Sequence, residues 1–478
     1  MYSHPRLLLT IASGVFPLAA TATDDVRALL RQLGNQVAEL KQHADQADAR
    51  IRDLETRLAA EQQKNRQLTT QSPPPPANGV VAVSASPAAN PTEAKPETKP
   101  PVTLGDTKGT FKIPGTDTSL GFGGFVKLDV NENSVSAPSF GDQFLSISNI
   151  PVSHRGEDSQ LAFNARESRF WFKSFTPSAW GDINTYLELD LYGAAASYTP
   201  RLRHAYGSFG NFLAGQTWTT FLNELAAPDT LDNAGPVGLA KFRQPLVRWT
   251  QPFKFAGESL DLQLAAESPN STLWTGSGWS PALGTLTYDN LTATGDDRYP
   301  DLIAKLVYKP DWGNLSLAAM GRQIRNANNT SGAAREAWGG GVSLAGKINV
   351  FELDNIRFTL NYGNAIGRYS SVNRLEDAAL DSAGNLHLVN VYSAVTAYQH
   401  WWSNTWRSSF AYGFEQADQP DFVAATMTRQ AQSVHANLLW SPLPQATLGI
   451  EYLYGSRELI DGRNGNISRA MFSAKYNF

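Results

Sequence analysis

Apolar and polar side chains alternate along the last residues of the chain. One parity is apolar and ends in an aromatic residue: Ala470, Phe472, Ala474, Tyr476 and Phe478. The other is polar apart from one methionine: Arg469, Met471, Ser473, Lys475 and Asn477. Successive side chains of a β-strand point to opposite sides, so this segment predicts a strand with one face in lipid and the other in water. A soluble sheet can end in the same way. Recurrence of the pattern along the chain is what favours a membrane barrel over a soluble sheet.

The alternation recurs in short segments over residues 105–478. Clear examples are 120–130, 182–192, 260–267, 302–309, 315–322, 356–363, 405–414, 432–440 and 448–454. Their connections alternate between short turns and long polar loops, which distinguishes an up-and-down outer-membrane barrel from a β-sandwich. A hairpin of two strands with its turn and loop averages about 45 residues. Residues 105–478 therefore hold about eight hairpins, which predicts an all-β transmembrane barrel of about sixteen antiparallel strands. A barrel of that size encloses an aqueous channel.

Charged residues fall on one parity of these strands. The outward parity of 120–130, 183–191 and 260–264 carries no charge. This is expected of a lipid face, because Lys or Arg near the bilayer centre costs about 2 to 4 kcal/mol. In one segment the apolar residues change parity between Phe163 and Phe170, which predicts a bulge, or a strand extending beyond the membrane, near Arg166 to Ser168. The inward parity carries Lys127, Asp129, Glu188, Asp190, Asp261 and Glu267.

Aromatic residues gather at the proposed turn ends, as an interfacial girdle requires. Aromatic residues scattered through a core are the alternative. The set is Trp180, Phe253, Phe255, Trp312, Trp401, Trp402, Trp406, Trp440 and Phe478.

The N-terminal part follows other patterns. Residues 1–22 resemble a secretory signal peptide, with Arg6 before a short apolar stretch and Ala20-Thr21-Ala22 at the cleavage site; a buried N-terminal helix is the alternative. Between Val26 and Leu58, apolar residues recur with alternating gaps of four and three; Glu61 then breaks the pattern, Asn65 continues its spacing and Leu68 closes it. This predicts an α-helical coiled coil over residues 23–70, placed in the periplasm. A single amphipathic helix lying on a larger domain would instead drift toward a 3.6-residue period.

Within the heptads, Arg50-Ile51-Arg52-Asp53-Leu54-Glu55 resembles a motif of three-stranded coiled coils. Arg50 and Glu55 flank the apolar seam, where they can pair between chains. Residues 71–104 are rich in Pro, Ala and Thr and predict an extended linker that cannot bury a core. We therefore expect a homotrimer with a periplasmic rod.

Composition narrows the function classes. Only 18% of residues are charged, 42% are hydrophobic and 11% are aromatic, a mixture that alternating strands produce. Cysteine is absent, which excludes disulfides and thiolate chemistry. The formal charge is −4 and no long basic stripe is present, so we expect no nucleic-acid partner. Seven histidines without clustered spacing make a metal site unexpected, and no cofactor motif is found.

Residues 198–252 resemble the Gly-x-Phe-Gly hairpin of general diffusion porins, with Gly207-Ser208-Phe209-Gly210 at the turn. In those porins the next strand leads into a loop folded inside the channel, a position held here by 221–240. The resemblance therefore predicts an inner constriction loop near 221–240 that carries Glu224, Asp229 and Asp232. Gln216 departs from the pattern, because many porins place Arg there.

The order of signal peptide, coiled coil, Pro-rich linker and porin-sized barrel resembles the DcaP-type family of trimeric outer-membrane channels. The resemblance covers most of the mature chain, and its motifs are specific for architecture more than for cargo. It implies uptake of small organic anions, including dicarboxylates, by a homotrimer in outer-membrane lipid.

Basic residues predominate on the inward parity, which predicts anion preference if the lumen is narrow. We expect Arg169, Arg201, Arg203 and Arg248 to lie near the inner loop and bind carboxylates. Alternatively these arginines only balance the acidic residues of the lumen and inner loop. On the barrel wall, those acids are Glu188 and Asp190.

Other functions remain open. A structural anchor would use the coiled coil to tie the barrel to another envelope component such as peptidoglycan. An outer-membrane hydrolase would need a lipid-facing His and Ser pair; His204 lies on the outward parity, but no Ser motif accompanies it. Loop acids such as Asp296-Asp297 could bind calcium, although solvated loop charge explains them as well. We expect a channel rather than an enzyme.

Overall fold

The computed structural model describes residues 103–136, 145–152, 159–179, 181–193, 198–239, 241–274, 297–327, 335–370 and 375–478. The chain divides into two units, Met1–Glu97 and Thr98–Phe478, and only the second contains described residues. The predicted signal peptide (1–22), the predicted coiled coil (23–70) and all but the last two residues of the predicted linker (71–104) lie outside the described residues. No helix among the described residues is long and apolar enough to cross a membrane.

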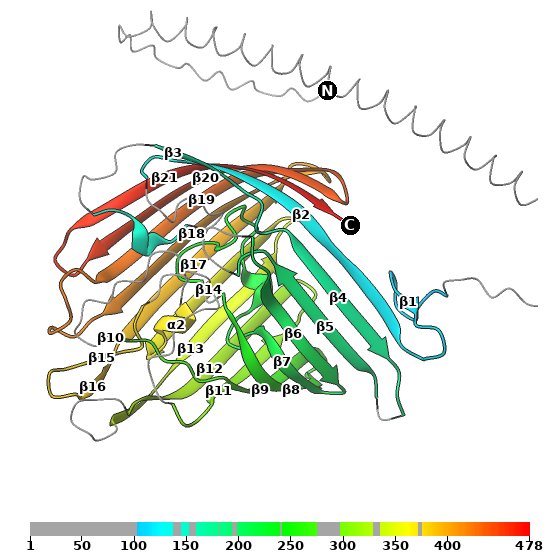
Figure 1. Ribbon diagram of the computed structural model, residues 1–478, viewed down its shortest axis with the longest axis horizontal. Coiled ribbons are helices and arrows are strands. Elements are labelled where there is room, and N and C mark those ends of the chain that lie inside the picture. The colour runs from blue at the N-terminus through cyan, green and yellow to red at the C-terminus, as the bar shows by residue number, and fades with distance from the viewer. Residues whose placement is uncertain are drawn as a thin grey trace, which may run out of the picture. The chain divides into compact units, whose positions relative to one another are not determined.

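One sheet closes on itself into a barrel of sixteen antiparallel strands, which confirms the predicted fold class (Figure 1). The second strand consists of two pieces, β3 (Gln160–Asn164) and β4 (Arg169–Thr176). The other barrel strands are β2 (Ser119–Asn133), β5 (Ile183–Asp190), β6 (Arg201–Phe209), β7 (Phe212–Trp218), β8 (Arg243–Phe255), β9 (Glu258–Glu267), β11 (Asp301–Tyr308), β12 (Gly313–Asn326), β13 (Arg335–Asn349), β14 (Asn355–Asn364), β17 (Asn390–Trp401), β18 (Trp406–Asp418), β19 (Thr428–Leu443), β20 (Ala446–Leu459) and β21 (Asn464–Asn477).

The barrel closes where its first strand meets its last. β2 pairs with β21 from Phe125–Asn477 to Asn133–Arg469. Below this seam, β1 (Phe111–Lys112) pairs with the start of β2. The backbone N–H of Phe478 donates to the Gly124 carbonyl oxygen (3.1 Å), so the C-terminus is fixed at the seam.

Small elements lie in the connections. A short sheet joins β10 (Leu273–Trp274), β15 (Ala378–Leu380) and β16 (Leu386–Leu388). The helical turns are η1 (Ile147–Asn149), η2 (Glu224–Ala226) and α2 (Gly367–Ser370).

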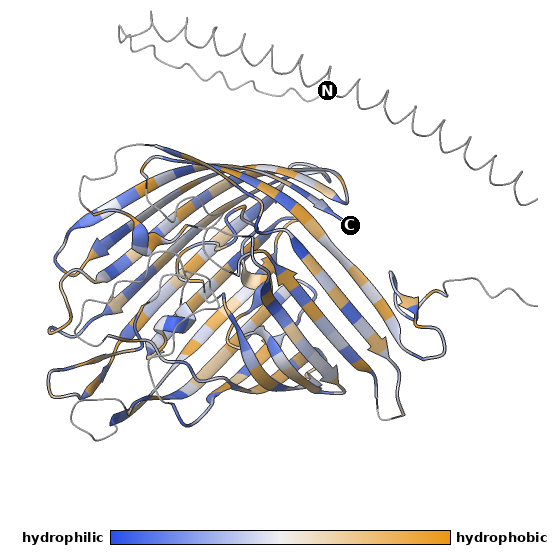
Figure 2. Ribbon diagram, viewed as in Figure 1, coloured by the Kyte–Doolittle hydropathy of each residue, from blue (hydrophilic) through white to orange (hydrophobic). Residues whose placement is uncertain are grey.

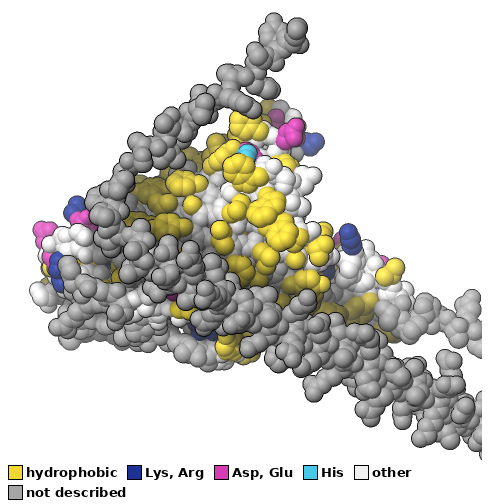
Figure 3. All heavy atoms as spheres, turned by 90° about the horizontal axis from the view of Figure 1, so that it is seen from above, with side chains coloured by type: hydrophobic (Ala, Val, Ile, Leu, Met, Phe, Trp, Pro, Cys, Tyr) yellow, Lys and Arg dark blue, Asp and Glu magenta, His cyan; other side chains and the backbone are white. Residues whose placement is uncertain are grey.

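Hydrophobic and hydrophilic residues alternate along the strands (Figure 2), and many of the large apolar side chains are exposed while charged ones are buried. On β2, Phe122 is 63% exposed while Asp129 is fully buried inside the barrel. Figure 3 shows apolar side chains covering an outer face, with charged side chains toward its edges. The predicted separation of charge between the two parities is therefore confirmed on β2, as lipid contact requires.

The predicted irregularity near Arg166 is a bulge between β3 and β4. Between the pairs Phe125–Arg169 and Asp129–Asn164, β2 contributes three residues (126–128) and its partner contributes four (165–168). The extra residue inverts the parity, so Phe163 and Phe170 both face outward, 64% and 42% exposed. The bulge also turns Glu167 into the lumen, where its carboxylate meets the Lys127 ammonium (2.5 Å).

Exposed aromatic side chains surround the end of the barrel that carries the short turns, consistent with a girdle. Trp406 and Trp440 stack there with ring centroids 5.5 Å apart. Trp180, one of the predicted girdle residues, lies outside the described residues. The large exposed members of the predicted set are Phe253, Phe255, Trp312, Trp402, Trp406, Trp440 and Phe478.

Candidate constriction inside the barrel

The loop between β7 and β8, here called L3, consists of residues 219–242 and contacts inward-facing residues of many strands. At its start, the Thr219 hydroxyl and the Thr220 backbone N–H donate to the Glu267 carboxylate of β9 (2.7 and 2.6 Å). The Asn223 amide then donates to Asn314 and Ser316 of β12 (2.9 and 3.0 Å). These bonds hold the first part of L3 against the barrel interior.

L3 continues across strands that are distant in sequence. Its Ala227 carbonyl accepts from Arg357 of β14 (2.5 Å), and its Asp229 carboxylate accepts from Arg407 of β18 (2.8 Å). The backbone N–H of Leu231 donates to Glu451 of β20 (2.7 Å). L3 therefore lies inside the barrel. Most of these bonds are along one side, although Leu231 and Asn233 also accept from Lys127 of β2 and Arg169 of β4 (both 3.2 Å).

Loops before β3 and β17 also pack inside on that side. Leu145, Ile147 and Ile150 form an apolar cluster with Val237 of L3 and with barrel residues. Ile366, Tyr369 and Leu375 form a second cluster with Phe221 and with residues of β11, β12 and β17. We call the inward faces of β11–β21, on which these loops pack, the packed wall.

A buried ionic network fixes the loop that contains α2 to the packed wall. The Arg322 guanidinium of β12 lies 3.2 Å from Asp301 and 3.0 Å from Asp377, and all three side chains are fully buried. The Tyr369 hydroxyl donates to Asp301 (2.7 Å) and accepts from the Gln244 amide (3.0 Å). Gln244 in turn contacts Glu267, the residue that holds the start of L3.

The inward faces of β4–β8 form a different surface, which we call the basic wall. Arg201 makes two hydrogen bonds to the Asp190 carboxylate (2.9 and 2.6 Å). Arg203 bridges Glu188 and Asp190 (2.6 and 2.9 Å). The structure therefore brings four of the predicted site residues together. Arg169 lies beside them, 3.8 Å from Glu188, and it donates to Glu167 and to Asn233 of L3 (both 3.2 Å).

Arg203 occupies a bulge in β6. Glu188 pairs with His204 and Leu189 pairs with Leu202, so Arg203 is an extra residue on β6. Both Arg203 and His204 are buried inside, and His204 Nδ1 lies 3.0 Å from the Thr217 hydroxyl. The prediction that His204 faces lipid was wrong, because the bulge shifts the alternation by one residue.

Gln216 has a structural role at the same bulge. Its amide donates to the carbonyl oxygens of Leu202 and Arg203 (3.1 and 3.3 Å). The departure from the porin pattern noted in the sequence thus satisfies backbone groups that the bulge leaves without ladder partners.

Three charged residues lie where L3 faces the basic wall. Arg248 makes no ion pair with a described residue, and its Nε has no hydrogen-bond partner among them. Desolvation within the lumen raises the pKa of Glu224 on L3, although its side chain is exposed, and Lys305 and Arg248 oppose that rise. Burial, reinforced by Arg169, lowers the pKa of Lys241 to about 8. Lys241 donates only to the Asn233 carbonyl (2.9 Å) among the described residues.

The other two predicted loop acids lie elsewhere. Asp229 is bonded to Arg407 on the packed wall. Asp232 is almost completely buried, accepts from the Leu145 backbone N–H (2.7 Å) and lies 3.6 Å from Arg469. Both carboxylates hold L3 in place, so of the three predicted loop acids only Glu224 faces the basic wall.

Sequence reasoning missed Lys241 and Arg243 as site residues. Arg243 lies over the Trp218 ring, 4.3 Å from its centroid, and Lys241 stands two residues earlier at the end of L3. Both residues follow directly on the predicted inner loop, and this pair of cations at its end is the sequence feature from which they could have been predicted. Among the described residues, no group of three His, Asp or Glu side chains could hold a metal ion.

A closed barrel of this size, apolar outside and polar inside with loops folded into its lumen, defines an outer-membrane porin. A model of the family described as "DcaP outer membrane protein" matches residues 110–478. The chain belongs to this DcaP family, as its sequence pattern predicted. The family and the fold are those of non-enzymatic channels in the outer membrane.

Several solved structures are similar. The outer membrane channel DcaP of Acinetobacter baumannii is 22% identical, with 78% of this chain and 100% of that chain covered and a TM-score of 0.66. An anion-selective porin from Comamonas acidovorans is 12% identical, with 76% and 100% covered and a TM-score of 0.46. OmpT of Vibrio cholerae is 12% identical, with 76% and 98% covered and a TM-score of 0.45. A comparison with curated proteins gave no match.

Proposed function

We propose that this porin is a passive uptake channel for small hydrophilic solutes and favours organic anions such as dicarboxylates. The observation that carries the proposal is the composition of the basic wall. Its cations outnumber its two carboxylates, Glu188 and Asp190, which already bind Arg201 and Arg203. The other cations are Arg169, which is paired with Glu167 of the adjoining bulge (3.2 Å), and Lys173, Arg243 and Arg248, with Lys241 at the end of L3.

The position of L3 supports selectivity at this wall. Charges act over a Debye length of about 8 Å at physiological salt, so a wide pore would screen them. L3 fills the side of the packed wall, which leaves solutes to pass between Glu224 and the cations of β4–β8. A carboxylate there gains from Arg248 and Lys241, whereas the guanidinium of Arg169 already binds Glu167 (3.2 Å).

The alternative that the arginines only balance acids applies best to Arg201 and Arg203. Their bidentate and bridging bonds to Asp190 and Glu188 make them a fixed, nearly neutral cluster. Arg248 has no such partner among the described residues. Arg248 and Lys241 are therefore the stronger candidates for contact with the solute.

We also propose that the chain is a homotrimer. Strands β4 to β7 have 8, 8, 9 and 7 residues, whereas β19 to β21 have 14 to 16. Eight residues at a tilt of about 40° rise about 21 Å, less than the apolar band of about 25 Å. A neighbouring subunit can cover the outer face of the short strands β4 to β7 better than lipid can. A signal peptide (1–22), a periplasmic coiled coil (23–70) and a linker (71–104) complete the proposed domain order.

Reversal potentials across planar bilayers test the anion preference. In a salt gradient, wild type should favour anions, and Arg201→Ala/Arg203→Ala should shift toward cations because Glu188 and Asp190 lose their partners. Glu188→Gln is the matched control and should shift the other way. Unchanged selectivity in folded trimers would contradict the assignment. A folded barrel that never conducts would favour the alternative, a structural anchor that ties the membrane to peptidoglycan or another periplasmic component.

A further inference from the structure

Two long loops meet through a buried acid–amide pair at the loop end of the barrel. Glu376 belongs to the loop that contains α2 (365–389), here called the α2 loop, and Gln419 begins the loop between β18 and β19. The Gln419 side-chain amide donates to Glu376 Oε2 (2.8 Å). Glu376 is 1% exposed, and neither its Oε1 nor the Gln419 Oε1 has a hydrogen-bond partner among the described residues.

A proton on Glu376 can satisfy both of these oxygens. An ionised carboxylate only accepts hydrogen bonds, so it would leave two buried acceptor oxygens without a donor, which is costly. A neutral carboxyl can donate from Oε1 to the Gln419 amide oxygen while its Oε2 accepts from the amide N–H. The second hydrogen bond between the two loops therefore requires the protonated form of Glu376.

Burial and one neighbouring charge favour that protonated form. Burial raises the pKa of Glu376 to about 7, and Asp377 adds to the rise, whereas the Gln419 amide opposes it. The nearby cations of β12 and α2, Arg322 and Arg368, act on Asp377 instead. The acids closest to Gln419 in sequence are exposed on the surface, namely Asp418 and Asp421.

The pair connects the neighbouring loop to the lumen. Leu375, which directly precedes Glu376, packs in a buried cluster with Phe221 of L3. Three residues further on, Ala379 packs with Val423 of the loop between β18 and β19. In sequence, the acid–amide pair thus lies between an apolar contact with L3 and an apolar contact with the neighbouring loop, so its loosening would reach the inner loop.

We propose that Glu376 and Gln419 form a proton-dependent clasp, which holds the α2 loop inside the barrel in acid and loosens as the pH rises through neutrality. The sign follows from linkage. In the docked loop Glu376 keeps its proton up to about pH 7, whereas in a released loop it returns to its ordinary pKa of 4.5. Docking is therefore strongest below pH 4.5, and its equilibrium constant should fall about tenfold between pH 6 and pH 8.5.

The Arg322 network still keeps the α2 loop docked most of the time, so the change appears as more frequent release of the loop. Release widens the lumen and does not depend on which solute passes. The proposal is therefore separate from the anion preference of the basic wall.

Limited proteolysis of the folded, detergent-solubilised protein tests the clasp. Cleavage within residues 365–389 should be about tenfold faster at pH 8.5 than at pH 6 in wild type. Glu376→Gln keeps both hydrogen bonds without a titratable group, so its loop should be cleaved slowly at both pH values. Its rate in the same buffer also corrects for the pH dependence of the protease. Glu376→Ala lacks the clasp and should be cleaved quickly at both.

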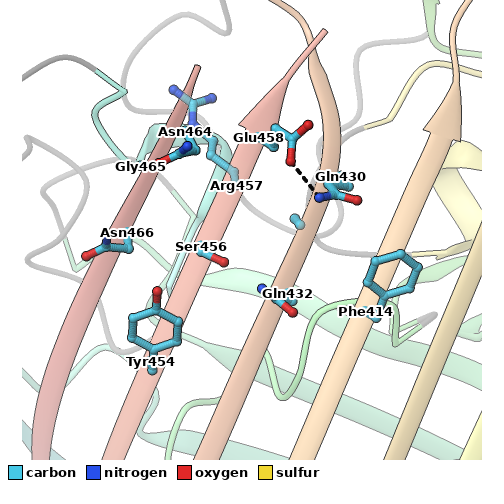
Figure 4. A pocket seen from close by; sticks show the side chains of 11 residues that line it. Phe414, Gln430, Gln432, Tyr454, Ser456, Arg457, Glu458, Asn464, Gly465 and Asn466 are labelled. Carbon is cyan, nitrogen blue, oxygen red and sulfur yellow. Dashed lines mark hydrogen bonds between the residues drawn. The ribbon is translucent and has the colours of Figure 1, made fainter. Parts of the chain in front are cut away.

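A second acid–amide pair on the outward face of the barrel supplies the matched control. Gln430 of β19 donates to Glu458 of β20 (2.7 Å) beside a polar hollow of about 230 Å³ (Figure 4). The Glu458 side chain is partly exposed, and the pair joins two adjacent strands rather than two loops. Glu458→Gln should therefore leave the pH response of the α2 loop as in wild type.

Single-channel recordings give a second readout, because the frequency of current steps should rise with pH in wild type and stay constant in Glu376→Gln. Three outcomes would overturn the proposal. Wild-type cleavage that is the same at pH 6 and pH 8.5 would show that no proton controls the loop. A wild-type pH response that persists in Glu376→Gln or in Glu376→Ala would assign the titration to another group. Faster cleavage at pH 6 than at pH 8.5 would contradict the sign.

Discussion

The two sides of the lumen hold their charges in different ways. On the basic wall, Arg201 and Arg203 bind carboxylates of the adjacent strand β5. On the packed wall, cations bind groups supplied by loops: Arg407 binds Asp229 of L3, and Arg322 binds Asp377 of the loop that contains α2. Strand residues thus pair Arg201 and Arg203 on the basic wall, whereas loop residues supply much of the neutralisation on the packed wall, where Arg322 also binds Asp301 of the adjacent strand β11.

We therefore expect the basic wall to set the ion selectivity of the channel, and the loops on the packed wall to set the width of its lumen. Hydrogen bonds to the neighbouring strand β5 position Arg201 and Arg203, whereas Arg169 also donates to Asn233 of L3 (3.2 Å). The packed wall is apolar and neutral only while its loops remain in place. A loop that leaves it would both widen the lumen and expose cations such as Arg322, whose side chain is now fully buried.

Breaking the packed wall at Arg322 should have the largest effect. Replacing Arg322 by Met leaves Asp301 and Asp377 buried without their partner, which costs about 3–5 kcal/mol. The α2 loop should then detach far more often, seen as current fluctuations and as protease cleavage within residues 365–389. Lys347→Met, at a half-buried cation of β13, is the control and should change neither. A quiet, protease-resistant Arg322→Met channel would contradict this reading.

Removing the centre of L3 should have the next largest effect. Replacing residues 224–238 by a short Gly-Ser linker should raise single-channel conductance severalfold, because the loop occupies the interior beside the packed wall. Heat modifiability on gels should show that the barrel remains folded. If conductance stays the same with the barrel intact, L3 does not limit the channel.

Substitutions in the basic wall should change the ion selectivity of the channel rather than its conductance. Arg248→Ala removes a cation that has no ion-pair partner among the described residues, so the anion to cation permeability ratio should fall about two- to fivefold. Arg248→Lys should keep most of the ratio. Lys347→Ala, on the packed wall, should change the permeability ratio less than Arg248→Ala does. An equal change would show that the basic wall is not the more selective of the two walls.

The smallest expected effect is a pH dependence at Lys241. Its pKa is lowered to about 8, so its charge is present at pH 7 and is lost as the pH rises through 8. Anion preference should therefore decline between pH 7 and pH 9. Reversal potentials of Lys241→Met should be flat over this range, and a wild-type decline that persists in that variant would assign the titration to another group.

The sequence contained enough information for the fold because lipid restricts composition so strongly. A charged residue is rare on an outer face, and this rule located even the parity change at Arg166 to Ser168, which proved to be a bulge. The bulge at Arg203 escaped notice because Leu202 and His204 flank it without an apolar run that would reveal the shift.

The path of L3 could not be derived from the sequence. Asp229 and Asp232 are typical solvent-exposed loop acids in composition, yet their partners Arg407 and Arg469 lie 178 and 237 residues further along the chain. Spacing carries no information about such contacts. Only the resemblance to porin hairpins suggested an inner loop, and it did not indicate which acid would face the basic wall.

The seam between β2 and β21 has a consequence for biogenesis. The Arg469 side chain donates to Asn133 (2.7 Å) across 336 residues of chain, so the ring of strands can close only after the C-terminal strand has been synthesised. Until then, the nascent chain has two unpaired edges that can recruit other strands. A chain truncated before Asn464 should therefore aggregate or be degraded by periplasmic proteases instead of forming a smaller pore.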